Sequence, residues 1–249
     1  MTFPNDPAML LSVLNTKLRD FYPTLDALCD DMEADKDELI KKCAAIGYTY
    51  IPERNQFILR GRMMLETELK CMLDKETYDR LESAFTWDEV FEQVNSYYTD
   101  PYGTLKQNGI TLRVRTKNGM DIIQVKTHKN ADSPLQIAEE AEFDCSGIPE
   151  SFSAEDVKKM TGIEVPASLL GSLTTKRHSL MYCDGVEICL DKNDYLDKTD
   201  YEIEVEYTRE IPDELKESLR TAGVEFKAPA VGKCSRFMIR LANILKGEI

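Results

Sequence analysis

Two different patterns of apolar and polar residues follow one another along the chain. Residues 8–60 contain apolar side chains at helical spacing, which the run from Met9 to Leu18 shows clearly. From residue 62 onward, short runs alternate apolar and polar residues with the period of two that is typical of β-strands. The pattern therefore predicts a small helical region followed by a strand-rich one.

The first region is predicted to form a small helix-turn-helix-like module. Thr24 follows Pro23 as a helix N-cap, and a further helix begins near Asp35 and stops before Gly47. A DNA-reading helix brings Arg and Lys to phosphates, but residues 26–38 contain seven acids and one lysine. DNA binding by residues 1–61 is left open and not favoured, and we expect an interaction or dimerisation module.

Eight alternating runs after residue 62 predict an antiparallel β-domain. Turn residues separate many of the runs, and those at 118–119 and 184–185 have the Asn-Gly and Asp-Gly sequences of two-residue hairpins. So many short strands favour an antiparallel barrel or sandwich over a parallel α/β sheet. Helices are predicted as interruptions at 75–84, 154–162 and 213–222. The eight runs span residues 64–70, 90–98, 110–116, 120–127, 136–144, 172–182, 186–191 and 201–207.

Charged residues occupy one face of several of these predicted strands. Glu66, Glu68 and Lys70 share a face, as do Arg113 and Arg115. A solvated sheet surface alternates in the same way, so a single strand does not decide between surface and interior. Because acidic and basic strands occur in one domain, we favour a closed barrel with the charges inside. Carboxylates there would hold Mg²⁺ or Mn²⁺, and Arg and Lys would bind a polyphosphate.

Composition narrows the function further. The net charge of −14 argues against general affinity for DNA or anionic membranes, and no apolar run reaches the roughly 20 residues that span a bilayer. Seven scattered cysteines without a C-x-x-C pair and without a secretory leader predict reduced thiols in a cytoplasmic protein and disfavour zinc. G-K-C at 232–234 resembles the end of a P-loop, but no glycine precedes it at the required spacing and the Ser/Thr is missing. His128 and His178 are predicted to be surface or tunnel-mouth residues rather than a catalytic pair.

Several motifs in sequence order resemble one known family. E-T-E-L-K at 66–70 resembles the E-x-E-x-K signature of the CYTH domain, the fold of the triphosphate tunnel metalloenzymes. One such motif occurs by chance, but six in order are specific, and they cover about residues 62–246. The long segment at 190–206 looks most like that of the bacterial stand-alone CYTH phosphatases. The other matching motifs are N-S-Y-Y-T-D at 95–100, L-R-V-R at 112–115, Q-V-K at 124–126 and T-T-K-R at 174–177.

The resemblance implies an α+β fold in which an eight-stranded antiparallel tunnel with flanking helices, at 62–249, follows the small helical domain at 1–61. It also implies roles for particular residues. Metal ligands would be Glu66, Glu68 and Glu206, supported by Glu204, Glu202 and Asp191. Phosphates would be bound by Lys70, Arg113, Arg115, Lys126, Arg177, Lys233 and Arg236. Lys233 and Asp191 would act in catalysis, and Glu140, Glu142 and Glu187 would line the tunnel.

Two departures from the family pattern concern substrate contacts. Gln124 stands where the family often has threonine, and the segment at 138–142 lacks an arginine that many members carry. The predicted function is hydrolysis of inorganic tripolyphosphate or an organic triphosphate with Mg²⁺ or Mn²⁺. Two alternatives stay open: cyclisation of ATP, as in the class IV adenylate cyclases of the family, and a polyphosphate-sensing regulator. A homodimer is also left open.

Overall fold

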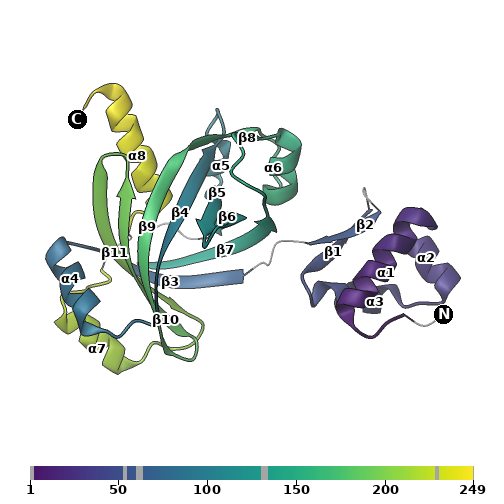
Figure 1. Cartoon of the computed structure of the whole chain (residues 1–249), viewed down its shortest axis with the longest axis horizontal. Helices are drawn as coiled ribbons and strands as arrows, with labels where there is room; N and C mark the ends of the chain where they lie inside the picture. The colour runs from purple at the N-terminus through teal and green to yellow at the C-terminus, as the bar shows by residue number, and fades with distance from the viewer. Residues whose placement is uncertain (1–2, 53–54, 60–63, 130–133, 228–229, 249) are drawn as a thin grey trace. The chain divides into compact units, whose positions relative to one another are not determined.

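The computed structural model describes residues 3–52, 55–59, 64–129, 134–227 and 230–248, and the chain divides into two compact units, Met1–Met63 and Met64–Ile249 (Figure 1). Among the described residues, no helix combines the length and the hydropathy that crossing a bilayer requires.

The N-terminal unit contains three helices and a β-hairpin. The helices are α1 (Pro7–Asp20), α2 (Leu25–Met32) and α3 (Lys36–Ala44), and the side chains of Asp6, Thr24 and Asp35 cap their N-termini. Strands β1 (Tyr48–Ile51) and β2 (Gln56–Leu59) pair in antiparallel fashion, so the helical region ends at Ala44 and not near residue 60. The alternation of aromatic and β-branched residues in Tyr48–Ile51 favours a strand.

One asparagine connects the hairpin to the first helix. Asn55 adopts a left-handed backbone conformation with φ of 47°. Its Nδ2 atom donates to the carbonyl oxygens of Leu18 at 2.9 Å and Tyr22 at 2.6 Å, and its Oδ1 atom accepts from the Tyr50 hydroxyl. These bonds hold the turn of the hairpin against the C-terminal end of α1, beside a core that includes Leu10, Leu14 and Phe57.

The C-terminal unit is built on a closed antiparallel β-barrel of eight strands, as the sequence predicts. The ring order is β10-β11-β3-β7-β6-β5-β4-β9, and a further pairing of β9 with β10 closes it. Two-residue turns at 118–119 and 184–185 connect β5 to β6 and β9 to β10. The strands are β3 (Met64–Leu73), β4 (Glu89–Thr99), β5 (Ile110–Lys117), β6 (Met120–His128), β7 (Leu135–Asp144), β9 (Ala167–Cys183), β10 (Val186–Tyr195) and β11 (Lys198–Tyr207).

Helices cover the outer, apolar faces of the barrel. Helices α4 (Lys75–Ala84) and α7 (Asp213–Thr221) pack against Val186, Ile188, Ile203 and Val205 of β10 and β11. The short helix α5 (Thr104–Gln107), the short strand β8 (Ser151–Phe152) and α6 (Ala154–Thr161) cover β4, β5 and β6. Since apolar side chains point out to these helices, the alternating polar ones point inward.

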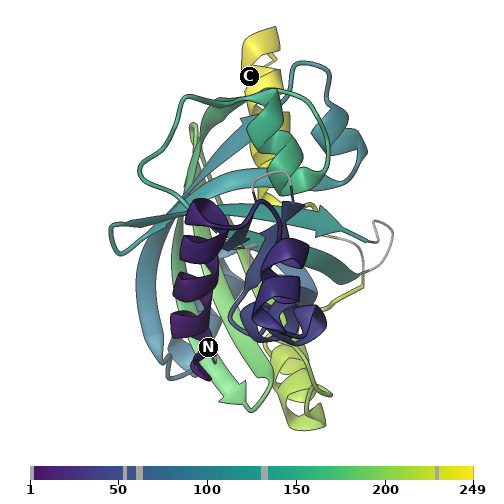
Figure 2. The ribbon, with the colours of Figure 1, turned by 90° about the vertical axis from the view of Figure 1, so that its right-hand side faces the viewer.

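Helix α8 (Lys233–Lys246), which the sequence analysis does not predict, lies at one end of the barrel and α7 lies toward the other (Figures 1 and 2). The ring of Phe237 packs among Tyr97, Leu173 and Tyr195, which are contributed by three different strands. Gly171 has φ of 150°, and a Cβ there would lie 2.6 Å from Cζ of Phe237. Only glycine allows this close approach, so the sequence of β9 is adapted to the docking of α8.

Candidate metal and phosphate site

The interior of the barrel is charged and encloses a cavity of about 260 Å³. Side chains of Glu68, Lys70 and Glu204 are at most 5% exposed, and Asp191 and Glu202 are fully buried. Burial of so many charges is stable only when they pair with one another or with a ligand. The pairing therefore shows which charges are already balanced and which are open to a ligand.

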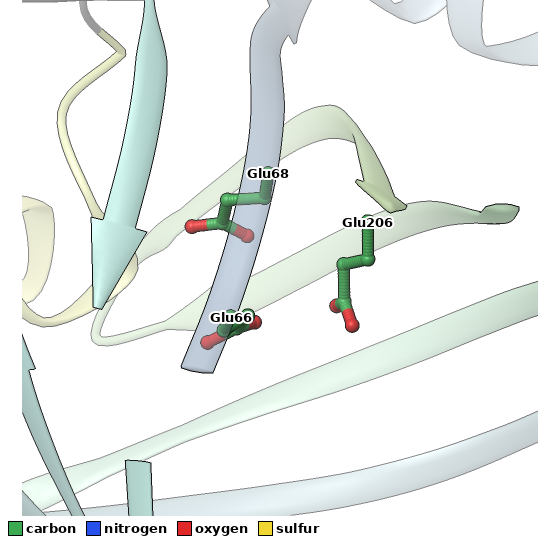
Figure 3. A group of neighbouring side chains, drawn as sticks. All are labelled: Glu66, Glu68 and Glu206. Atoms are coloured by element: carbon green, nitrogen blue, oxygen red, sulfur yellow. The ribbon is translucent and has the colours of Figure 1, made fainter. Parts of the chain in front are cut away.

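Three carboxylates from two paired strands lie together at one side of this cavity (Figure 3). Glu66 and Glu68 come from β3, and Glu206 comes from β11, where it pairs with Glu68 in the register of the two strands. One oxygen of each lies within 4.8 Å of the others. The nearby cations are Lys126, which contacts Glu66 at 2.6 Å and Glu68 at 3.3 Å, and Lys70, which contacts Glu68 at 3.4 Å. Arg177 lies 3.8 Å from Glu206.

Glu206 is the carboxylate with the weakest compensation in this group. Burial, together with the negative charges of Glu66, Glu204 and Glu68, raises its pKa to about 8, although Arg177 acts in the opposite direction. Three oxygen donors that repel one another suit a divalent cation such as Mg²⁺ or Mn²⁺. The donor set of Glu66, Glu68 and Glu206 therefore fits a metal.

A second acidic group is already balanced by bases. Lys233 Nζ lies 2.9 Å from both Asp191 and Glu204 and also contacts Glu202. The other bases around this group are Arg236, 2.9 Å from Glu202, Lys70, 2.8 Å from Glu204, and Arg177, which is bidentate to Asp191.

The pKa values in this second group show the same balance. Although burial raises the pKa of Glu202, the charges of Lys233, Lys70 and Arg236 dominate and lower it to about 2. The acids in turn keep the pKa of Lys233 above its ordinary value despite burial. Asp191, Glu202 and Glu204 thus form an ion-pair network that joins β10 and β11 to the first turn of α8.

Two arginines on β5 differ in their partners. Arg113 donates to Gln124 at 2.8 Å and to Glu140 at 3.1 Å, and Gln124 in turn donates to Glu142 at 2.6 Å. Arg115 donates through Nε to Asn95 at 3.0 Å, and within the described residues no carboxylate is within 4.0 Å of its nitrogens. Burial and the charges of Arg113 and Arg177 lower the pKa of Arg115 to about 10. Arg115 is therefore a partly buried cation that an anion would stabilise.

The structure brings the residues singled out from the sequence into one interior, with two exceptions in position. Arg236 lies on the buried face of α8, where it forms ion pairs with Asp200 and Glu202. Glu187 lies at the barrel mouth, where it accepts a hydrogen bond from the Ser179 hydroxyl. The remaining phosphate and metal candidates line the central cavity or the adjoining ion-pair network. Lining the central cavity are Glu66, Glu68, Lys70, Arg113, Arg115, Lys126, Glu140, Glu142, Arg177, Glu204, Glu206 and Lys233.

The two histidines have different positions. His128 lines the central cavity at the end of β6. The prediction of a surface or mouth position is wrong for His178, which is 4% exposed on the outer face of β9. It lies beneath α4, 3.4 Å from the Tyr78 hydroxyl and 3.1 Å from Glu82. Strand alternation accounts for this, because its neighbour Arg177 points inward.

Three polar residues of β4 also face the interior, and the sequence analysis assigned no role to them. Within the described part of the chain, Gln93 Nε2, Asn95 Nδ2 and the Tyr97 hydroxyl are buried without a hydrogen-bond partner. Their spacing of two along the run V-F-E-Q-V-N-S-Y-Y is the signal that would have placed them on one face. Buried polar groups without partners are uncommon in native proteins, so they mark a surface suited to a polar ligand.

A closed barrel with opposed acids and bases defines the class of protein: residues 64–232 match the CYTH domain, and the chain belongs to that family. Residues 4–57 match a domain of unknown function, DUF4250. The chain is 31% identical over 147 residues to "Putative triphosphatase YjbK" of Bacillus subtilis, an alignment that covers 57% of this chain and 77% of that protein.

Solved structures show the same fold. A protein of Bacillus halodurans described as a "putative adenylate cyclase" is 26% identical with a TM-score of 0.56, over 70% of this chain and 98% of that one. The Hippeastrum protein HpAC1, described as a "putative adenylyl cyclase" that reveals a dominant triphosphatase activity, is 21% identical with a TM-score of 0.55, over 70% and 95% of the two chains.

Proposed function

We propose that the barrel hydrolyses a triphosphate with the help of Mg²⁺ or Mn²⁺. The observation that carries this proposal is the trio Glu66, Glu68 and Glu206, in which the pKa of Glu206 is raised. The same cavity contains Arg115, a cation that contacts no carboxylate among the described residues. A bound metal would neutralise the three carboxylates, and a polyanion would neutralise Arg115. The similarity to a protein named as a triphosphatase supports the same reading.

Glu66, Glu68 and Glu206 would hold the metal, which when bound neutralises phosphoryl oxygens. Lys126 now contacts Glu66 and Glu68, and it is placed to transfer its hydrogen bonds to a phosphate when a metal takes over the carboxylates. Lys70, which contacts the same oxygen of Glu68 as Lys126, would do the same. The contacts of these two lysines would therefore depend on whether the three carboxylates are bound to a metal.

The arginines would orient the phosphate chain. Arg113 is held by Gln124 and Glu140, and Arg177 is held by Asp191, so both guanidinium groups are fixed before substrate arrives. Preorganised donors of this kind stabilise charge that develops in phosphoryl transfer without reorganising. Arg115, which contacts no carboxylate within the described part of the chain, would contribute a further cation.

Lys233 and Asp191 would act together near the terminal phosphate. Because its pKa is raised, Lys233 stays protonated and cannot serve as a general base. It would donate hydrogen bonds to the attacking water or to a phosphoryl oxygen, while Asp191 keeps its ammonium group in place at 2.9 Å. Glu202, Glu204 and Arg236 would support this arrangement through the ion-pair network.

Residues 62–249 would form the catalytic tunnel domain, and residues 1–61 an interaction module in a cytoplasmic protein. In the N-terminal unit the acids of α2 and α3 outnumber the bases, and Lys36 and Lys42 are engaged by Asp26 and Glu38. DNA binding is therefore not part of the proposal, and a protein partner or a second copy of the chain is favoured.

Release of phosphate from tripolyphosphate, ATP and thiamine triphosphate with Mg²⁺ or Mn²⁺ tests the proposal. We expect metal-dependent release by the native protein and its loss in Glu68→Gln. Metal-independent release, or full activity of Glu68→Gln, would contradict it. Cyclisation of ATP is the second candidate, favoured by the likeness to the Bacillus halodurans protein, and formation of cyclic AMP and pyrophosphate would identify it.

A further inference from the structure

A second cavity, of about 480 Å³, adjoins the phosphate-facing interior at the mouth near the hairpin turn at 118–119. We name it the mouth pocket. It shares four lining residues with the central cavity, Arg115, Gln124, Glu142 and Arg177. A substrate whose phosphates contact Arg115 and Arg177 therefore extends into the mouth pocket if it carries another group.

Part of the wall of the mouth pocket is apolar, and charged and polar side chains line the rest of it. Phe91 occupies the inward face of β4, two residues before Gln93. Ile122 and Met120 occupy the inward face of β6, two and four residues before Gln124, and Met120 is 66% exposed. Phosphate oxygens gain nothing from aliphatic and aromatic carbon, whereas an organic group is stabilised by covering it.

Polar and charged groups at this wall could orient a bound group. Gln93 is 3% exposed, faces the mouth pocket, and its Nε2 atom has no hydrogen-bond partner among the described residues. Lys117 Nζ lies 3.5 Å from the centre of the Phe91 ring, so a cation covers one face of that ring, and a planar group that stacks there would replace it. Arg115 and Lys117 are two residues apart on β5, about 7 Å along the strand. A group joined to a phosphate at Arg115 would therefore lie beside Phe91.

We propose that the mouth pocket binds the organic part of an organic triphosphate, a flat heterocycle that stacks on Phe91 and accepts a hydrogen bond from Gln93. The inference rests on the proposed triphosphatase function and adds the substrate class to it. Met120 and Ile122 cover the edge of the heterocycle, and Lys117, displaced from the ring face, contacts the phosphate nearest to it. Inorganic tripolyphosphate has no organic group to occupy this pocket.

Steady-state kinetics of Phe91→Ala with ATP, thiamine triphosphate and tripolyphosphate test the proposal, with Mg²⁺ present. We expect the native protein to prefer an organic triphosphate, and Phe91→Ala to raise its KM about tenfold. The kcat/KM for tripolyphosphate should change less than twofold. Val90→Ala is the matched control, because Val90 is the neighbouring residue, lies on the outer face and is 53% exposed.

Three outcomes would contradict the proposed role of the mouth pocket without contradicting the triphosphatase function. They are activity of the native protein on tripolyphosphate alone, equal losses of activity on all substrates in Phe91→Ala, and an unchanged KM of Phe91→Ala for organic triphosphates. If no triphosphate is hydrolysed, the proposed function fails. Calorimetric titration with Mg–ATP and with Mg–tripolyphosphate then tests separately whether the mouth pocket binds an organic group. Binding of ATP that weakens about tenfold in Phe91→Ala, with tripolyphosphate unaffected, supports it, and equal affinities in native and variant proteins overturn it.

Discussion

Oδ2 of Asp191 lies 2.9 Å from Nζ of Lys233, although Asp191 belongs to β10 and Lys233 begins α8. The same ammonium group also contacts Glu202 and Glu204 of β11. One lysine therefore contacts three buried carboxylates and attaches the C-terminal helix to the barrel.

Replacement of Lys233 by methionine should strongly destabilise the C-terminal unit. The variant leaves buried carboxylates with fewer cations, which costs about 3–5 kcal/mol in the free energy of unfolding. Denaturant unfolding followed by circular dichroism measures this. Lys246→Met, an exposed change in the same helix, should alter the free energy of unfolding by less than about 0.5 kcal/mol. Equal stability of the two variants would show that Lys233 does not anchor α8.

Acid should unfold the native protein through the same network. The pKa of Glu202 is lowered to about 2, below its ordinary value of 4.5, so its ionisation stabilises the fold above pH 4.5. That contribution is lost as pH falls from about 4.5 to about 2. Urea midpoints should therefore decrease from pH 4.5 to pH 3. Glu202→Gln should have a shallower dependence over this range, and a dependence as steep as that of the native protein would refute the assignment.

Glu206→Gln should separate stability from activity. The pKa of Glu206 is raised to about 8, so in the metal-free protein its ionisation becomes unfavourable as pH rises from 4.5 through 8, and stability falls. The neutral amide removes this cost, and we expect a higher Tm than native at pH 9 without metal. Metal-dependent phosphate release should fall at least about 100-fold.

Calorimetry in chelator and a phosphate-release assay check both results for Glu206→Gln. Glu214→Gln, in an exposed position of α7, is the control and should change neither quantity. A lower Tm for Glu206→Gln at pH 9 would contradict the electrostatic description of the trio.

Gln124→Thr should weaken substrate binding. Gln124 is 4% exposed and connects Arg113 to Glu142 through bonds of 2.8 Å and 2.6 Å, which threonine is too short to make. A hydrogen bond to a charged group contributes about 1.5–3 kcal/mol, so we expect KM for a triphosphate to rise roughly tenfold or more. The exposed change Gln107→Thr is the control. An unchanged KM would show that Arg113 is oriented by Glu140 alone.

Asn55→Ala should unfold the N-terminal unit at a lower temperature without affecting hydrolysis. The variant loses the bonds to Leu18, Tyr22 and Tyr50 and places alanine at positive φ, at a combined cost of about 2–4 kcal/mol. Asn55→Gly loses the same bonds but relaxes the backbone, so it should be about 1 kcal/mol more stable than Asn55→Ala. Differential scanning calorimetry resolves the change, and identical transitions in native and Asn55→Ala proteins would refute it.

Sequence periodicity predicts most of the barrel because its strands satisfy two requirements at once. Glu202, Glu204 and Glu206 alternate with apolar residues that α4 and α7 cover, and Asn118-Gly119 and Asp184-Gly185 make the tight turns. Local rules are sufficient there. The direction of the charged face is a property of ring closure, and it becomes known only when β9 pairs with β10.

Helix α8 shows what local rules miss. Its buried residues are Lys233, Arg236 and Phe237, so two of the three positions that face the barrel are cationic. A search for apolar residues at helical spacing does not find such a face. The partners of these cations are also distant in the sequence, and the three-carboxylate environment of Lys233 depends on strands that begin some 40 residues before it.

The ring order also sets an electric field across the bore of the barrel. In the ring of eight, β11 with its three glutamates stands opposite β5 with Arg113 and Arg115, and β10 stands opposite β6 with Lys126. A bare polyanion would be attracted to one wall and repelled by the other. A metal–phosphate complex has a positive end and a negative end. The field should therefore attract the complex and orient it, with the metal toward the acidic wall and the phosphates toward the basic wall. We therefore expect the barrel to bind the metal–phosphate complex in preference to the free anion.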